Sequence, residues 1–279
     1  MPQFLAPDGA ALYFDAYEPA EGHPKSAVLF LPGWSDHAAR WSRVGERLRQ
    51  ASVAAYLLDV RGHGRSGGRQ GHLSRFSQLL ADLQAFRRVV RQRTQAPQVL
   101  LGHSFGALVA LRYLESQPSD AIAAAVLVSP WLGLAFPPPR WKLALGRLLP
   151  DVWPTLTLST GIEPDHLSRD PAVGAAYETD PLVHNVITTG AWREIQWAQR
   201  VVAADAGRIE PPLLFLLAGE DRIVDAQLAR AFADSLKSPV QVQWYPEMYH
   251  EILHDPQAEE AMDDLLQFLA RRELSAGPR

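Results

Sequence analysis

Short apolar runs recur along the chain, and most of them are closed by Gly, Pro or Asp. Unbroken runs of this kind are typical of strands buried on both faces of a sheet. They occupy residues 27–31, 53–58, 99–101 and 122–128, and the pattern returns at 213–217 and 240–244. An opening segment with Pro7, Asp8 and Gly9 between apolar stretches predicts an antiparallel hairpin at the edge of the sheet.

Helical spacing separates these predicted strands. Between the second and third runs, apolar residues succeed one another at intervals of three and four, as on the buried face of a helix: Phe76, Leu79, Leu80, Leu83, Phe86 and Val90. Similar patterns come after Ser104, cover 226–236 and begin near 257. Strands that alternate with helices predict an α/β fold with a mostly parallel, doubly wound sheet.

Residues 131–209 interrupt this alternation. The segment holds five of the eight Trp residues and many Pro residues, and it contains no convincing strand. A structureless loop of this length is implausible in a compact domain, so we predict a helical cap inserted into the fold. The predicted catalytic core then comprises residues 1–130 and 210–279.

Composition narrows the classes of function. The 279 residues include no Cys, which excludes a disulfide scaffold, a thiolate zinc site and a cysteine nucleophile. A net charge of -4 gives no footprint for nucleic acid. The first residues lack the features of a signal peptide, and no stretch approaches the roughly 18 apolar residues of a membrane span. These features predict a soluble, cytoplasmic protein.

A Gly-x-Ser-x-Gly motif lies between a predicted strand and a predicted helix, at residues 102–106. A sharp strand-to-helix turn lifts the Ser104 hydroxyl clear of the sheet, and the flanking glycines remove Cβ atoms that would collide with nearby backbone. The context favours Ser104 as a nucleophile over the alternative that it only caps the next helix.

A serine nucleophile needs a base, and the base needs an acid that fixes its tautomer. Asp221 lies just past the run 213–217, with Glu220 and Asp225 as local competitors. His250 lies in the loop after the last predicted strand, and His254 is its alternative. The order Ser, acid, His agrees with the nucleophile-elbow architecture.

The remaining histidines call for simpler interpretations. His103 is interpreted as a buried support for the turn at Ser104, and His63 as a residue with a structural hydrogen bond in a turn-rich loop. No pair of histidines has metal-ligand spacing on a predicted helix, so we expect no metal site. No redox cofactor or nucleotide is implied either.

Backbone N–H groups should stabilise the negative charge that develops on the substrate oxygen. One is the N–H of Phe105, the residue after the nucleophile, and the other is expected from the loop after the first buried strand. Gly33 lets this loop turn so that the Trp34 N–H points at the same position. The alternative is a plain turn at the end of the strand.

Taken together, these segments resemble an α/β-hydrolase of the monoacylglycerol lipase and lysophospholipase group of serine hydrolases. The resemblance spans nearly the whole chain, with motifs at 32–37, 59–66, 102–106, 219–221 and 249–250 and cap fragments at 167–170 and 180–182. It implies a catalytic triad of Ser104, Asp221 and His250, with Trp34 and Phe105 as oxyanion donors. One departure is Pro32, where relatives usually have His.

The apolar cap suits a fatty acyl chain. Residues expected to contact the substrate are Trp131, Leu132, Phe136, Trp141 and Leu145. A predicted helix near 139–149 has an apolar face that could lie on a lipid surface or pack onto the core. The hypothesis is a carboxylic ester hydrolase that acts on small-molecule acyl lipids.

Three alternatives to this hypothesis stay open. An aminopeptidase of the same fold would need cap carboxylates for the substrate ammonium, for which Glu163, Asp165, Glu178 and Asp180 are candidates. A carbon–carbon bond hydrolase shares the triad. A non-catalytic binding module would leave the complete Ser, Asp and His set unexplained. The oligomeric state is not predicted.

Overall fold

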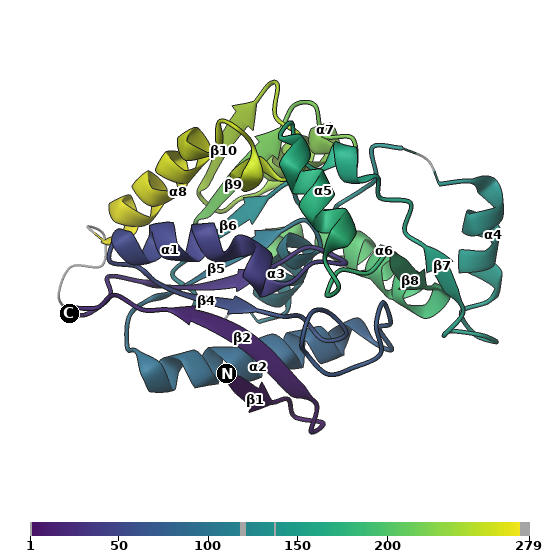
Figure 1. Ribbon diagram of the computed structural model, residues 1–279, viewed down its shortest axis with the longest axis horizontal. Helices are drawn as coiled ribbons and strands as arrows, with labels where there is room; N and C mark the ends of the chain where they lie inside the picture. Colours follow the sequence, from purple (N-terminus) through teal and green to yellow (C-terminus); the bar gives the residue numbers. More distant parts are fainter. Residues whose placement is uncertain (1, 118–120, 137, 274–279) are drawn as a thin grey trace.

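The computed structural model describes residues 2–117, 121–136 and 138–273. Its centre is an eight-stranded sheet in the order β1-β2-β4-β3-β5-β6-β9-β10 (Figure 1). The strands from β4 to β10 in this order are parallel, and β1 and β2 form the antiparallel hairpin at the edge. The bounds are β1 Gln3–Leu5, β2 Ala11–Tyr17, β3 Ala27–Leu31, β4 Ala54–Leu58, β5 Gln98–His103, β6 Ala124–Val128, β9 Leu213–Ala218 and β10 Val240–Tyr245.

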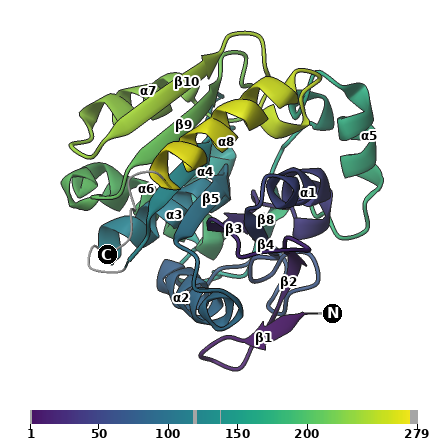
Figure 2. The same ribbon diagram turned by 90° about the vertical axis from the view of Figure 1, so that its left-hand side faces the viewer.

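Helices cover both faces of the sheet because successive strand residues point to opposite sides. In β3, Ala27, Leu29 and Leu31 belong to one hydrophobic cluster, whereas Val28 and Phe30 belong to the other. Figure 2 shows α1 and α8 on one side of the sheet and α2, α3 and α6 on the other. Their bounds are α1 Ser42–Gln50, α2 Phe76–Arg93, α3 Phe105–Ser116, α6 Thr189–Ala204 and α8 Ala258–Glu273, and α7 spans Ala226–Ser235. The predicted doubly wound α/β fold is confirmed.

Parallel register places the functional loops side by side. Leu31 of β3 pairs with Gly102 of β5, so the loop after β3 begins next to Ser104. Ala218 of β9 pairs with Tyr245 of β10, so the loops after these two strands also meet. All four loops leave the carboxyl edge of the sheet, which is where open α/β sheets bind ligands.

The cap contains a small sheet that the sequence pattern does not predict. Strands β7 (Thr157–Ser159) and β8 (Val186–Thr188) pair antiparallel, which corrects the expectation of a wholly helical insertion. Three residues are too few to show an alternation of apolar and polar positions. The cap helices are α4 (Arg140–Leu148), α5 (Pro171–Thr179) and α6, and α6 packs against α3 of the core. The division of the chain at residues 130 and 210 stays a prediction.

Three short 3-10 helices lie near the site or in the cap, at Ala38–Trp41, Pro164–His166 and Ile252–His254, and another is Ala206–Arg208. Within the ranges that the structure describes, no helix has the length and apolar character needed to cross a membrane.

Candidate active site

Ser104 occupies a strained turn between β5 and α3. Its backbone has φ 52° and ψ −111°, a conformation that L-residues rarely adopt. A Cβ at Gly102 would lie 2.5 Å from the Ala107 nitrogen, and a Cβ at Gly106 would run into the Leu31 carbonyl. The two glycines are therefore required for α3 to start this close to the strand that carries the nucleophile.

His250 and Asp221 meet at the ends of β10 and β9. The Nδ1–H of His250 donates to Asp221 Oδ2 over 2.8 Å, and both side chains are buried. Asp221 Oδ1 accepts the backbone N–H groups of Ile223 and Val224 at 2.8 and 2.9 Å. With Nδ1 protonated toward the carboxylate, Nε2 is left as the proton acceptor.

Ser104 and His250 line the same cavity. Among the described side chains, no direct hydrogen bond joins the Ser104 hydroxyl to the imidazole. Catalytic hydrogen bonds are often long in unliganded enzymes and tighten when substrate binds. The geometry thus places the candidate nucleophile and the candidate base in one cavity, with the carboxylate of Asp221 bonded to the far side of the imidazole.

The competing residues have other partners. Asp225 caps α7 by accepting the Leu228 N–H at 2.9 Å, and Glu220 is exposed. His254 bonds to Glu251 over 2.6 Å through its Nδ1 and stacks on the indole of Trp41. The structure therefore brings His250, and not His254, to the carboxylate of Asp221.

The loop after β3 passes directly beside the nucleophile. A Cβ at Gly33 would lie 3.5 Å from the Ser104 Cβ. The backbone N–H groups of Trp34 and Phe105 donate no hydrogen bond to any residue that the structure describes. The Trp34 indole is fixed by a hydrogen bond from Nε1 to the Val186 carbonyl at 3.0 Å and by an edge contact with the Phe105 ring. Two free N–H groups beside Ser104 have the composition of an oxyanion hole.

The two histidines at the centre of the site have opposite pKa shifts. Burial alone would lower the pKa of His250, but the charge and hydrogen bond of Asp221 raise it, with help from Glu251 and Asp36. Burial, together with the nearby His250, lowers the pKa of His103 to about 3. The two ring centroids are 4.8 Å apart, so His103 stays neutral beside the base and adds no competing charge.

A cavity of about 290 Å³ extends from Ser104 into the cap. Of the predicted cap residues, Trp131 and Phe136 line it. Leu132 instead packs against the core, Trp141 points into solvent, and Leu145 is half-buried outside the lining. The apolar wall also includes Leu134, Leu143, Leu158, Ile162, Ile187 and Trp192, and the sequence pattern did not predict the last four. An apolar stripe along α6 was the available signal for Trp192.

No group of three or more His, Asp or Glu residues that could hold a metal ion occurs in the described part of the chain. The polar groups of the cavity include the candidate nucleophile and the candidate base.

Comparison with known proteins gives the family. Residues 22–257 match the Hydrolase_4 family, which is described as serine aminopeptidase, S33. The chain belongs to this family of α/β-hydrolases. Its fold agrees with that membership.

Individual relatives are similar over nearly the whole chain. A monoacylglycerol lipase from Mycolicibacterium smegmatis is 28% identical over 95% of each chain. Lysophospholipase L2 from Escherichia coli is 26% identical over 92% of this chain and 84% of that protein. The crystal structure of a Paleococcus ferrophilus monoacylglycerol lipase has a TM-score of 0.83 and 29% identity, and the alignment covers 94% of this chain and 99% of that one. The resemblance to this group of serine hydrolases is confirmed.

Proposed function

We propose that the protein hydrolyses carboxylic esters of acyl lipids, with monoacylglycerols as the substrate class. The observation that carries the proposal is the mostly apolar cavity that leads from Ser104 into the cap. Ligand cavities of this kind bind apolar groups along their walls and orient them with a few polar groups. The names of the monoacylglycerol lipases similar to this chain agree with this substrate class.

The proposed reaction passes through an acyl-enzyme. Ser104 Oγ attacks the ester carbonyl carbon while His250 Nε2 accepts its proton, and Asp221 stabilises the resulting imidazolium. The Trp34 and Phe105 N–H groups donate to the carbonyl oxygen as it becomes negative. The C–O bond breaks, the alcohol leaves with the proton from His250, and water then repeats the attack to release the fatty acid.

Charges in the cavity favour an ester over a peptide with a free amino terminus. The four cap carboxylates that could hold a substrate ammonium do not line the cavity, and Asp180 already bonds to His37 over 2.9 Å. The carboxylates that do line it, Asp36 and Glu251, both bind Arg40. Lys142 also lines the cavity and would repel a substrate ammonium.

Labelling and a substrate panel test the proposal. We expect a fluorophosphonate to label the wild type and the control Ser235→Ala, in which the lost hydroxyl caps α7 far from the site, but not Ser104→Ala. Turnover of monoacylglycerol should fall at least about 10⁴-fold in Ser104→Ala. Labelling of Ser104→Ala would refute the nucleophile. Cleavage of an aminoacyl naphthylamide faster than the esters would replace the ester assignment by an aminopeptidase. Cleavage of a vinylogous diketone without ester turnover would replace it by a carbon–carbon bond hydrolase.

Contact with a lipid surface belongs to the same proposal. Trp141, Leu148, Val152 and Trp153 are each more than half exposed, and we call them the outer cap patch. They lie on α4 and the turn after it, at the end of the molecule farthest from α8 (Figure 1). The opposite side of α4 lines the cavity through Leu143 and Gly146. A lipid aggregate seated on the patch would thus lie next to the acyl cavity.

A charge in the patch tests this contact. Leu148→Asp should lower hydrolysis of micellar monoacylglycerol about tenfold or more, since burying one Leu side chain contributes roughly 1.5–3 kcal/mol. Hydrolysis of soluble p-nitrophenyl butyrate should not change. The matched control is Leu5→Asp on the distant edge strand β1, where the Leu side chain is 70% exposed. Equal losses on both substrates would remove the lipid surface from the proposal.

A further inference from the structure

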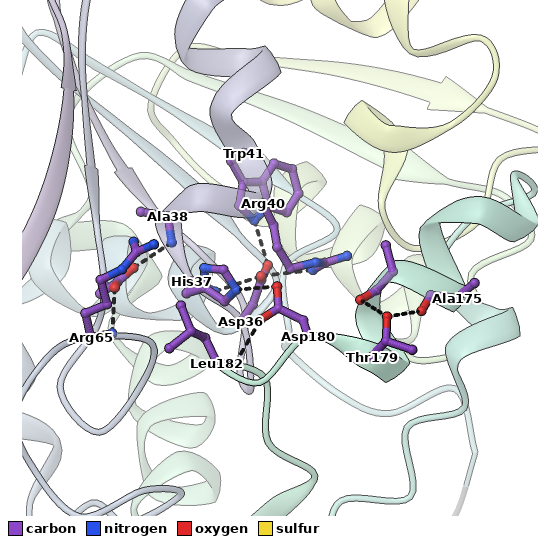
Figure 3. Close-up of polar contacts among 12 residues, drawn as sticks. Asp36, His37, Ala38, Arg40, Trp41, Arg65, Ala175, Thr179, Asp180 and Leu182 are labelled. Carbon is purple, nitrogen blue, oxygen red and sulfur yellow. Dashed lines mark hydrogen bonds and ion pairs between the residues drawn. The ribbon is translucent and has the colours of Figure 1, made fainter.

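Three charged side chains form a buried ion cluster beside the active site. Arg40 binds both carboxylate oxygens of Glu251 at 2.9 Å, and its Nη1 also donates to Asp36 Oδ1 at 2.9 Å. Each of the three side chains is at most 8% exposed. Figure 3 shows the Arg40 guanidinium and the Trp41 indole converging on Asp36. We call Asp36, Arg40 and Glu251 the ion triad.

The ion triad connects two loops that come from distant strands. Asp36 lies two residues after Trp34 in the loop after β3, and Glu251 directly succeeds His250 in the loop after β10. The backbones at both ends are held as well. Asp36 accepts the His37 N–H at 2.7 Å and the Trp41 Nε1–H at 2.6 Å, and the Glu251 N–H donates to the Leu167 carbonyl at 2.7 Å.

Stability alone is a poor reason for such a cluster. Removing three charges from water costs several kcal/mol for each ion, and well-packed apolar residues of similar volume are often as stable. A bidentate guanidinium does provide a fixed distance and angle between its two partners. In this molecule those partners are attached to the candidate oxyanion loop and to the candidate base.

We propose that Arg40 is a positioning residue for ester hydrolysis, because by binding Asp36 and Glu251 together it fixes the Trp34 N–H and the His250 imidazole relative to Ser104. This inference rests on the proposed function. Arg40 does not line the cavity, so its action is through its two partners and not through the substrate.

The charge of the ion triad also reaches the base. The charged groups that face His250 are Asp221 after β9, Asp36 after β3 and Glu251 on its own loop, and the neutral His103 lies at the end of β5. Burial raises the pKa of Glu251, but Arg40 and His254 lower it well below its ordinary value, so this carboxylate is ionised. A change of charge within the ion triad should therefore shift the acid limb of the pH profile of kcat/KM. The loss of a purely structural contact would not shift it.

The test uses Arg40→Met, Arg40→Lys and Glu251→Gln, assayed with p-nitrophenyl butyrate from pH 5 to 9 alongside thermal unfolding. We expect Arg40→Met and Glu251→Gln to lower kcat about 10²-fold with little change in KM, because a misplacement of about 1 Å has this effect. The acid limb of kcat/KM should move to lower pH in Glu251→Gln and to higher pH in Arg40→Met. Arg40→Lys keeps the charge but not the bidentate geometry, so it should lose kcat without moving the limb.

The matched control is Arg43→Met. Arg43 lies on α1 and pairs with Glu259 of α8 in an exposed ion pair at 2.7 Å, so its loss should leave the rate and the limb unchanged. Wild-type kcat in Glu251→Gln and Arg40→Lys would overturn the proposal. The proposal would also be overturned if all three variants lost kcat in proportion to a drop in melting temperature while the acid limb of kcat/KM stayed where it is in the wild type. If Arg40→Met fails to fold, Glu251→Gln and Arg40→Lys carry the test.

Failure of the proposed function gives a different result. In that case the wild type itself hydrolyses no ester, or a fluorophosphonate labels Ser104→Ala, and this inference falls with it. Failure of the positioning role alone leaves a wild type that is labelled at Ser104 and active, with variants of equal kcat.

Discussion

Replacing Asp221 with Asn removes one charge while it keeps the shape of the side chain, and the surroundings of Asp221 determine which way the new amide faces. Its Oδ1 accepts two backbone N–H groups, from Ile223 at 2.8 Å and from Val224 at 2.9 Å. An Asn at this position will direct its carbonyl oxygen to these donors. Its NH₂ group must then face His250 Nδ1 in place of Oδ2, which lies 2.8 Å from that nitrogen in the wild type.

The opposite orientation is unfavourable by an amount that the contacts define. A flipped amide would set NH₂ against two N–H donors, and each buried group left unsatisfied costs roughly 1–3 kcal/mol. Even about 2 kcal/mol in total keeps the flipped form below one molecule in about thirty. With an NH₂ donor facing it, Nδ1 must be the acceptor, so the proton moves to Nε2 and the imidazole can no longer accept the Ser104 proton.

We therefore expect Asp221→Asn to lower kcat about 10⁴-fold at pH 7, which corresponds to about 5.4 kcal/mol of transition-state stabilisation. The assay is initial-rate hydrolysis of p-nitrophenyl butyrate, with circular dichroism to establish folding. Asp225→Asn is the matched control in the same loop, because Asn caps a helix as well as Asp does and α7 should be unaffected. A folded Asp221→Asn enzyme within tenfold of the wild-type kcat would refute the assignment of Asp221 as the acid.

Local features of three other residues lead to further expected outcomes. Burial lowers the pKa of His63 to about 4, below the unfolded value of about 6.5. The contribution of neutral His63 to the free energy of unfolding is therefore fully present above pH 6.5 and is lost as the pH falls toward 4. Urea titrations should show a loss of stability over this range, of which about 3 kcal/mol comes from His63, and His63→Gln should remove that part; parallel curves would contradict this. Gly106→Ala should cost more than about 3 kcal/mol because its Cβ meets the Leu31 carbonyl, whereas Gly207→Ala, with open space around it, should unfold like the wild type. Ile187→Trp narrows the acyl cavity and should slow palmitate esters more than acetate esters, and equal slowing would place the acyl chain elsewhere.

The core of the fold could be predicted because its strands are buried on both faces. The run 27–31 coincides with β3, and 213–217 differs from β9 by a single residue. Helix α1 was missed because its sequence has only Val44 and Leu48 as large buried residues around a glycine. Strands β7 and β8 were missed because three residues carry too little pattern. Elements are thus predictable when they bury enough apolar residues to show a period.

The candidate triad could be predicted for a different reason. In a parallel sheet the carboxyl ends of all strands lie at one edge, so polar residues just after strands converge whatever their separation along the chain. The rule does not pair Arg40 with Glu251, because Arg40 lies in the short helix Ala38–Trp41, nine residues past the end of β3, and neither residue has a sequence pattern that indicates a buried ion pair. The cavity lining also depends on how the cap folds back onto the core. The helical pattern predicts that Trp141 and Leu145 share one apolar face, but it does not show that the other face of the helix lines the cavity.

The two sides of the site have different physical characters, and this difference bears on catalysis. On the side of β3 and β10, charges are buried but paired, and they fix the positions of the oxyanion loop and the base. On the side of the cap, the walls are apolar, and an acyl chain that enters the cavity displaces the water there. A hydrogen bond to a developing charge is stronger where water is excluded, and it needs no reorganisation where the donors are already in place. The carbonyl of a bound ester lies at the boundary of these two regions. An acyl chain that fills the cavity excludes water and so strengthens the hydrogen bonds from the oxyanion donors, and the ion triad holds the loop of one of these donors in position.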